Sequence, residues 1–506
     1  MKNKYLLLAI LTGSISLTGC EDFLDQKNTH DLNQETFFDS DAAVQAATAP
    51  LYNYVWNEFN DKFYYGMGDG RANNITAPYS AYVYPYTNFS ETALSDGLSS
   101  AWNSLYSVVA QANNTINNIL DFAGNGVSEQ GKNTGVAEAR FMRGTAYWYI
   151  ASLWGEGIIY TNTSSMVNNY VIPANPGIDM MEFAIRDLEF AAKYLPKVQS
   201  NQGRVTQYSA YGMLSRLYLS MAGLTTEGAY DGTNAATDFN RGTRNPYYLD
   251  LARKAALKVI EESGMSLTKN YGDLFKVTNR FNTEIIWGVN FSAALSEGWK
   301  GGQFLVRLLP ALDGVSNAQG WENATEDLWN SFDQQNDQRL DVTLKRSFTY
   351  SDGSVEDFDK PYVFKYWDSQ AEPKGNNTEA IFPAIRTAEM YLIIAEALNE
   401  INQGANEEAV IAINAVRNRA GLTTAVPTDY KGFKNAVLNE YRHEFVMEGH
   451  RWFDLTRMCT PQEFVSIIKA AKPESTPKEY HVKFPIPQRE IDLSQNTITQ
   501  NEGYGQ

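Results

Sequence analysis

The chain has 506 residues, of which 43% are hydrophobic and 20% charged, a composition typical of a folded globular protein rather than a disordered one. Its formal net charge is −17 at pH 7, and such an acidic surface repels phosphate backbones, which disfavours nucleic acid as a partner. The two cysteines, Cys20 and Cys459, are too few for a disulfide framework. Aromatic residues reach 13%, which indicates either an aromatic-rich core or a recognition surface.

The first twenty residues follow the plan of a bacterial lipoprotein signal peptide. Lys2 and Lys4 precede an apolar run that is too short to span a bilayer core of about 30 Å. Leu17-Thr-Gly-Cys20 then matches the lipobox pattern of aliphatic, small, small, Cys. We therefore expect residues 1–19 to be removed and Cys20 to carry more than one acyl chain, which gives stable anchoring. The alternative is an ordinary signal peptide with an incidental cysteine.

Apolar residues at three- and four-residue steps predict a series of helices after a tether at residues 20–40. The predicted helices cover residues 41–59, 101–122, 136–154, 179–195, 206–219, 249–262, 385–399, 407–420, 433–449 and 461–471. Helical pairs of about 35 to 45 residues, with small residues at their crossings, are typical of a tetratricopeptide-like array. We therefore predict a mainly α fold: a tetratricopeptide-like α-α superhelix with helical pairs at about 101–221 and 385–471, long loop-rich insertions and a few short strands.

Two long stretches without a helical pattern interrupt these pairs, at about 60–100 and 264–380. Gly, Asn, Pro and aromatic residues dominate the first, and the second contains short strand-like runs such as Ile285–Val289. Long irregular segments usually lie on the surface and carry function. We therefore expect residues 41–506 to form one domain in which the helices are the scaffold and the two insertions form the ligand side.

Five segments, taken in chain order, resemble the SusD-like (RagB/SusD) family of outer-membrane nutrient-binding lipoproteins. They are Cys20-Glu-Asp-Phe-Leu-Asp25 after the lipobox, Gly203–Leu219, Ile385–Asn399, Tyr441–Arg457 with its Glu-Gly-His-Arg-Trp core, and the Pro-Ile-Pro and Gln-Asn-Glu-Gly-Tyr elements of Phe484–Tyr504. The resemblance covers essentially the whole chain. It implies a lipoprotein that is anchored at Cys20, faces the cell exterior and caps a SusC-like TonB-dependent outer-membrane transporter. Such proteins deliver glycans or, in some branches, peptides for nutrient uptake, and they bind without cleaving.

Binding a sugar needs flat apolar faces for its C–H surface and planar polar groups for its hydroxyls. The first insertion offers polar side chains together with Tyr82, Tyr84 and Tyr86, which would share one side of an extended chain. In the second insertion, two Trp are flanked by Gly and polar residues, which makes burial difficult. The predicted ligand-binding residues are Asp69, Arg71, Asn73, Tyr82, Tyr84, Tyr86, Asn88, Trp299 and Trp321. The alternative for the tyrosines is a half-buried edge strand, which Pro85 favours.

The segment Tyr441–Arg457 contains the residues that most resemble a catalytic site. Glu444 and Glu448 lie four residues apart on one predicted helical face, the spacing that a lipid-anchored glycoside hydrolase would need for its two carboxylates. The neighbouring arginines oppose that role, because a nearby guanidinium lowers a carboxyl pKa where the catalytic acid needs a raised one. We therefore predict no enzyme, and ion pairs that hold one helix pair to the next, with Gly449 allowing close approach and Trp452 filling the seam.

Two further alternatives concern partners and cofactors. A pure helical-repeat assembly scaffold would leave the long aromatic insertions unexplained. No cofactor is predicted, and zinc is disfavoured because His30, His443, His450 and His481 show no ligand spacing with Cys. A structural calcium ion is left open, since Asp and Asn oxygens are abundant but no compact ligand loop stands out.

Overall fold

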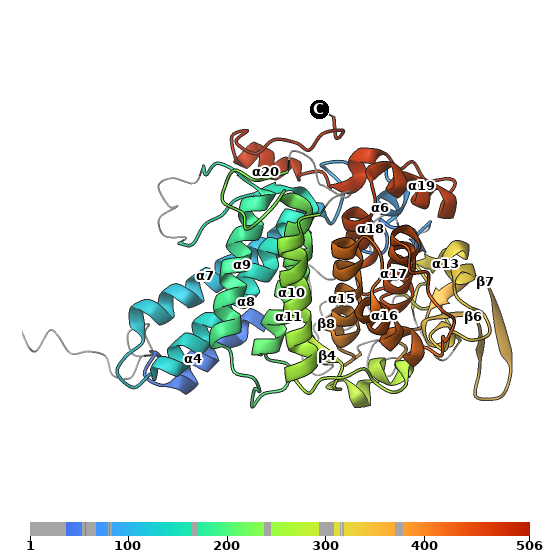
Figure 1. Ribbon diagram of the computed structural model, residues 1–506, viewed down its shortest axis with the longest axis horizontal. Helices are drawn as coiled ribbons and strands as arrows, with labels where there is room; N and C mark the ends of the chain where they lie inside the picture. Colours follow the sequence, from blue (N-terminus) through green and yellow to red (C-terminus); the bar gives the residue numbers. More distant parts are fainter. Residues whose placement is uncertain are drawn as a thin grey trace, which may run out of the picture.

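The computed structural model describes residues 37–52, 56, 67–78, 80, 83–162, 171–236, 244–292, 308–313, 315, 318–369 and 378–505. Across these residues the fold is mainly α, as predicted (Figure 1). The longer helices are α4 (Asp41–Thr48), α7 (Leu98–Phe122), α8 (Glu129–Trp154), α9 (Gly177–Tyr194), α10 (Gln207–Leu224), α11 (Pro246–Glu262), α15 (Thr387–Asn402), α16 (Glu407–Arg419), α17 (Tyr430–Glu444), α18 (Arg451–Met458) and α19 (Pro461–Ala471). Shorter helical elements are η1 (Ala49–Tyr52), α6 (Tyr84–Asn88), η4 (Tyr271–Phe275), η5 (Val277–Asn279), α13 (Glu326–Ser331), α14 (Leu340–Thr343), η9 (Glu479–Val482) and α20 (Gln488–Leu493).

The strands form four separate antiparallel pairs within the described residues. These are β1 (Ile75–Thr76) with β5 (Asn323–Ala324), β2 (Glu156–Gly157) with β3 (Asn175–Pro176), β4 (Ile285–Val289) with β8 (Phe382–Arg386), and β6 (Leu344–Thr349) with β7 (Val355–Val363). The strand predicted at Ile285–Val289 is confirmed and is buried along its whole length. Among the described helices, none is long and apolar enough to cross a membrane.

The long helices pack side by side in chain order. Helix α7 packs on α8, α8 on α9, α9 on α10 and α10 on α11, and α11 then packs on α15, which contacts α16 and α17. Figure 1 shows α7 to α11 in one half of the molecule and α15 to α18 in the other. The two predicted groups of helical pairs therefore form one continuous array, although the residues between them are loop-rich. The finer tetratricopeptide geometry of the pairs stays a prediction.

Helix ends follow local capping chemistry. Thr206 and Ser209 form a capping box at the start of α10, and Thr460 and Glu463 form another at the start of α19. Helix α8 begins seven residues before its predicted start. The prediction missed its first two turns because they are polar, include Gly135 and so lack an apolar pattern. A Cβ at Gly135 would lie 2.4 Å from Val44 Cγ1, so glycine allows α4 to approach α8 closely there.

Helix α17 ends at Glu444, five residues before the predicted end at Gly449, so Glu444 and Glu448 do not share one helical face as predicted. Side chains from distant segments donate hydrogen bonds to the Glu444 carbonyl, which a continued helix would have used as a backbone acceptor. The carbonyl of Glu444 accepts hydrogen bonds from Tyr271, Lys365 and Arg386 at 2.8, 3.2 and 2.7 Å. The chain turns through positive φ at Met447 (55°) and Gly449 (74°) before α18 begins. Gly449 therefore serves a turn rather than a helix crossing.

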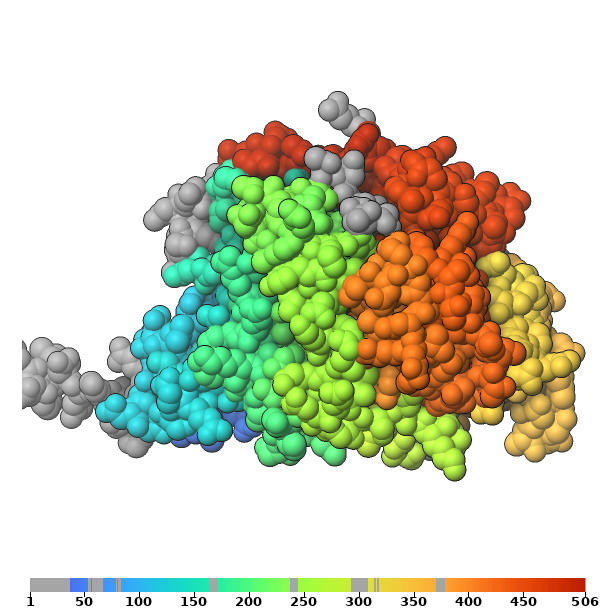
Figure 2. Space-filling model, in the orientation of Figure 1, coloured from blue at the N-terminus to red at the C-terminus, as the bar shows by residue number. Residues whose placement is uncertain are grey.

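The part of the second insertion between Leu309 and Trp367 has an apolar core of its own. Leu309, Leu312, Ala318 and Phe364 are buried there, and the rings of the β6–β7 hairpin pack against them. Figure 2 shows residues 318–369 as the end of the molecule, beyond the helices of the C-terminal half. This small core holds the end of the array that carries the second insertion.

Candidate ligand-binding surface

The polar residues predicted to bind ligand in the first insertion are buried within the scaffold. Asp69 accepts hydrogen bonds from the Asn74 amide (2.8 Å) and the Gly449 backbone N–H (3.1 Å). Arg71 pairs with Glu91 at 2.8 Å, and its guanidinium carbon lies 3.9 Å from the centre of the Phe484 ring. The expectation of exposed ligand contacts at Asp69 and Arg71 is therefore wrong, because both side chains are inaccessible.

Asn73 is also buried, so its predicted contact with ligand is wrong as well. Its hydrogen-bond partners explain why this loop is buried. The Asn73 side chain accepts a hydrogen bond from Arg451 Nε at 2.8 Å, and its backbone carbonyl accepts one from Arg442 at 3.2 Å. The buried Lys472 ammonium donates to the carbonyls of Gly70, Ile75 and Thr87 at 2.9, 3.1 and 3.1 Å. Burial lowers the pKa of Lys472 to about 7, yet three carbonyl acceptors match the three N–H groups of the charged form. The first insertion thus wraps around cations of the C-terminal helices.

Tyr84 and Tyr86 do not lie in the predicted extended run. Tyr84–Asn88 is the short helix α6, which Pro85 opens, so Tyr84 and Tyr86 point to different surroundings. Tyr86 is buried, and its hydroxyl donates to the Asp96 carbonyl at 2.6 Å, so its predicted contact with ligand is wrong. Tyr84 is 44% exposed and Asn88 is half-buried, and both stay predicted ligand residues. Tyr82 lies outside the described residues.

Trp321 of the second insertion lies beside the first insertion. It precedes β5 by two residues, and Pro78 follows β1 by two residues, so the antiparallel pair Thr76–Asn323 brings the two segments to the same edge. The Trp321 indole is half-buried and donates to the Gln319 side chain. The pairing of β1 with β5 therefore joins the two segments that were predicted to form the ligand side, with Trp321 partly accessible at the junction. Trp299 and the lipidation site Cys20 lie outside the described residues.

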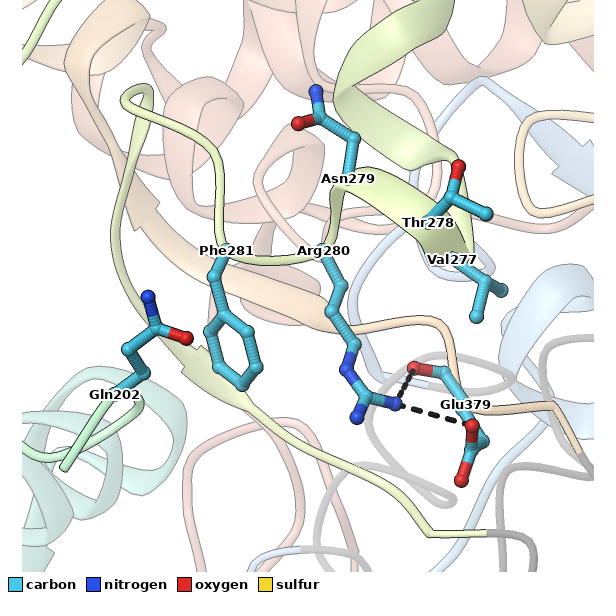
Figure 3. Close-up of a pocket in the computed structure, with 7 residues that line it drawn as sticks. All are labelled: Gln202, Val277, Thr278, Asn279, Arg280, Phe281 and Glu379. Carbon is cyan, nitrogen blue, oxygen red and sulfur yellow. Dashed lines mark hydrogen bonds and ion pairs between the residues drawn. The ribbon is translucent and has the colours of Figure 1, made fainter.

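A separate pocket of about 460 Å³ opens between the α9–α10 connection and the turn that precedes β4 (Figure 3). Its most exposed apolar group is the Phe281 ring, which is 41% exposed. Arg280 lies beside it and pairs with Glu379, with Nη1 3.3 Å from Oε2. Gln202, Val277, Thr278 and Asn279 complete the lining.

Sequence reasoning missed this pocket, although it lies within the predicted insertion 264–380 apart from Gln202. The signal was the short run Asn279-Arg-Phe-Asn282, in which an aromatic residue stands between polar ones directly before a buried strand. Gln202 and Glu379 come from distant parts of the chain, and only the fold brings them to Phe281.

The carboxylates that resembled a catalytic pair are fully buried in an ion-pair network, as predicted for a structural role. Arg386 pairs with Glu444 (2.5 Å), Glu448 (2.7 Å) and Glu284 (2.8 Å). Burial alone would raise the pKa of Glu444, but Arg419, Arg386 and Arg339 outweigh it and hold that pKa below its ordinary value. A substrate cannot reach these groups. The individual partners differ from the expected helix-to-helix pairs, since Arg451 bonds Asn73 and the Leu438 carbonyl (2.9 Å).

Within the part of the chain that the structure describes, no three His, Cys, Asp or Glu side chains are grouped so that they could hold a metal ion. The half-buried His443 shares a hydrogen bond with Ser331 at 2.9 Å, and desolvation together with the nearby arginines, Arg339 first among them, holds the His443 pKa well below the ordinary range.

A helical array with partly exposed aromatic side chains on loop-rich insertions, and with its strongest charge cluster sealed inside, defines a binding scaffold. Comparison with known protein families gives the same class. Residues 230–504 match the SusD family, and residues 22–219 match a family described as starch-binding and associating with the outer membrane.

The chain belongs to the SusD family. It is 32% identical to a SusD-like protein of Bacteroides ovatus over 90% of this chain and 82% of that protein. It is 25% identical to the starch-binding protein SusD of Bacteroides thetaiotaomicron over 73% of this chain and 72% of that protein. A crystal structure solved with a xylogluco-oligosaccharide superposes with a TM-score of 0.77 at 27% identity, covering 90% of this chain and 98% of the other.

Proposed function

We propose that this protein binds an oligosaccharide or polysaccharide at the cell surface and passes it to a SusC-like TonB-dependent transporter in the outer membrane. The observation that carries the proposal is the likeness, over nine-tenths of the chain, to a structure solved with a xylogluco-oligosaccharide. The starch-binding relative supports the same ligand class. The protein binds without cleaving, which agrees with the burial of its most enzyme-like carboxylates, Glu444 and Glu448.

The ligand surface in this proposal is the junction of the two insertions at β1 and β5. Trp321 offers a partly accessible indole face, and Tyr84 and Asn88 add a ring and an amide on the first insertion. Tyr82 and Trp299 remain candidates on the same two insertions. Aromatic faces with a few polar groups are what a sugar ring requires.

The direct test is binding and product analysis on a glycan panel. Starch, laminarin and xylogluco-oligosaccharides are offered to the purified protein in affinity electrophoresis and calorimetry, and the solutions are then analysed for shortened products. We expect binding of at least one glycan with no product release. Trp321→Ala should weaken that binding about tenfold with nearly unchanged melting temperature. Released products would overturn the binding-only function, and a large fall in melting temperature would identify Trp321 as a core residue.

The location and the partner are proposed on the sequence motif and the family. Cys20 would carry the lipid anchor, and the protein would face the exterior over its transporter. Replacing Cys20 by Ser should move the protein out of the outer-membrane fraction, and the unaltered protein should co-purify with a TonB-dependent transporter. An unchanged membrane fraction for Cys20→Ser would contradict the anchor.

A further inference from the structure

The pocket at Phe281 combines the groups that recognise a neutral sugar. Four side chains form one row on the same side of the loop in Figure 3: Gln202, Phe281, Arg280 and Glu379. The ring supplies a flat apolar face, the Gln202 amide can donate and accept, and the Arg280–Glu379 pair supplies donors and acceptors side by side. The volume of about 460 Å³ lies in the range typical of small-molecule sites.

The turn that carries Arg280 and Phe281 is braced by its own hydrogen bonds. The Asn279 side chain donates to the Asp273 carbonyl at 3.0 Å, and the Asn282 side chain donates to the Leu274 and Asn279 carbonyls at 3.1 and 3.0 Å. Phe281 is thus an exposed ring on a braced turn. Because the ring is fixed before a ligand arrives, binding costs little ordering of the loop.

The Gly203 turn fixes one edge of the pocket. Gly203 has φ of 92°, and a Cβ there would lie 3.6 Å from Phe281 Cε1 and 2.8 Å from the Asn290 amide nitrogen. The turn therefore contacts one edge of the Phe281 ring, while 41% of the side chain stays exposed. A ligand can reach the ring without any rearrangement of this turn.

The charges in the pocket select against ionic ligands. Arg280 and Glu379 neutralise each other, and each side chain is about one-third exposed, at 32% and 31%. An anionic ligand would meet the Glu379 carboxylate, and a cationic one would meet the Arg280 guanidinium, so neither gains a net attraction. A neutral polyhydroxylated ligand can bond to both groups.

The pocket is distinct from the junction of the two insertions. In Figure 1, β4, which follows the Phe281 turn, lies near the lower edge of the molecule, whereas α13, which follows Trp321 and β5, lies at the right-hand side. A glycan fragment at one place does not occupy the other.

We propose that this pocket is a second carbohydrate subsite, which takes one or two units of a neutral glycan through stacking on Phe281 and hydroxyl contacts to Arg280, Glu379 and Gln202. The proposal rests on the proposed carbohydrate-binding function. Two separate subsites on one surface-bound protein raise its retention of a long glycan, because the second contact is intramolecular.

The test compares Phe281→Ala with the matched control Tyr247→Ala, whose ring is 44% exposed on α11. The probes are malto-, laminari- and xylogluco-oligosaccharides in calorimetry, and the parent polysaccharides in affinity electrophoresis. We expect Phe281→Ala to weaken binding of the recognised polysaccharide about five- to tenfold, Phe281→Tyr to restore it, and Tyr247→Ala to leave it within twofold of the unaltered protein. Melting temperatures of all three variants should match the unaltered protein. Glu379→Gln, which keeps the shape but removes the charge, should weaken binding severalfold.

The outcomes separate this proposal from the one on which it rests. Unchanged affinity in both Phe281→Ala and Glu379→Gln, with binding still weakened in Trp321→Ala, would overturn the second subsite and leave the carbohydrate function standing. Binding of a peptide pool, rather than any glycan, that depends on Phe281 would overturn the assigned ligand class. No glycan binding by the unaltered protein would overturn both proposals.

Discussion

At the level of single residues, the buried arginines Arg339 and Arg386 are each stabilised by three carboxylates. Arg339 is fully buried and pairs with Glu440 at 2.6 Å, Asp337 at 2.8 Å and Glu444 at 2.9 Å. A guanidinium presents five N–H donors in a fixed plane, two more than an ammonium has, so it can bond several carboxylates at once. Such a group is costly to break, because removing one partner leaves a buried charge without its counterpart.

Glu448→Ala should destabilise the fold by about 3–5 kcal/mol, because it leaves Lys365 and Arg386 buried without one of their carboxylates. Chemical denaturation measures this loss. The matched control is Glu326→Ala, which removes an exposed carboxylate paired with Arg346 and should cost less than about 1 kcal/mol. A Glu448→Ala protein with native stability but no glycan binding would instead assign this segment to the ligand.

Glu396 should give the protein a dependence of stability on acid pH. Burial would raise the pKa of Glu396, but Arg457 and Arg244 outweigh it and lower that pKa to about 2. A carboxyl with a folded-state pKa below its ordinary value of 4.5 stabilises the fold fully above pH 4.5, and this stabilisation is lost as the pH falls toward 2. The whole contribution is about 3 kcal/mol.

The difference in unfolding free energy between the unaltered protein and Glu396→Gln should therefore shrink as the pH is lowered from 5 toward 2. Denaturant titrations at several pH values measure it. Glu262→Gln is the comparison: that exposed carboxyl also has a lowered pKa, because it pairs with Lys258 and Lys197, but solvent screens these pairs, so its difference should vary with pH far less than that of Glu396→Gln. A difference for Glu396→Gln that is constant with pH would contradict the lowered pKa.

At the level of elements, the ligand side depends on one lysine in α19's C-terminal cap. Lys472 holds the backbone of the first insertion through the carbonyls of Gly70, Ile75 and Thr87.

Lys472→Met should leave these three buried carbonyls without their donor, costing at least about 3 kcal/mol, and should raise hydrogen exchange in residues 67–89. Lys469→Met is the control, since its ammonium bonds the carbonyls of Pro473 and Ser475 within its own segment. Equal exchange in the two variants would rule out this anchoring role.

The elements that were predicted well are those whose signal is local. The predicted bounds of α19 are correct, because Thr460, Pro461 and Glu463 mark its start and apolar steps mark its face. The first insertion was misjudged because its Gly, Asn and polar side chains are also typical of an exposed loop. The arginines that bond Asn73 in the buried loop are Arg442 and Arg451, more than 350 positions further along the chain. No local sequence pattern near Asn73 indicates that they will contact it.

The early end of α17 has the same kind of cause. Its helical periodicity continues to Gly449, but Tyr271, Lys365 and Arg386 compete for the Glu444 carbonyl from three other segments. For the candidate site, the pairing of β1 with β5 joins the two predicted insertions, and Trp321, half-buried beside β5, stays a predicted ligand residue. The pocket at Phe281 was not, because Gln202 and Glu379 reach it only through the pairing of β4 with β8 and the packing of α10.

At the level of the whole molecule, two separately matched family regions share one core. The regions 22–219 and 230–504 divide the chain near the end of α10, yet buried polar contacts cross that boundary. Arg216 of α10 pairs with Glu389 of α15 at 2.6 Å, and Arg451 Nε donates a hydrogen bond to the Asn73 side chain at 2.8 Å. One cluster of buried apolar side chains also extends from Phe38 to Ile498.

We therefore expect the described part of the chain to unfold as one cooperative unit. Calorimetry should show a single transition, and Glu389→Gln should lower its midpoint without splitting it, because both halves lose the same pair with Arg216. Far-ultraviolet circular dichroism and tryptophan fluorescence should report the same midpoint. Two resolved transitions in the unaltered protein would mean that the α10–α15 contact does not couple the halves. In that case the ligand side, which is built from residues of both regions, would be an interface between two folding units rather than a surface of one.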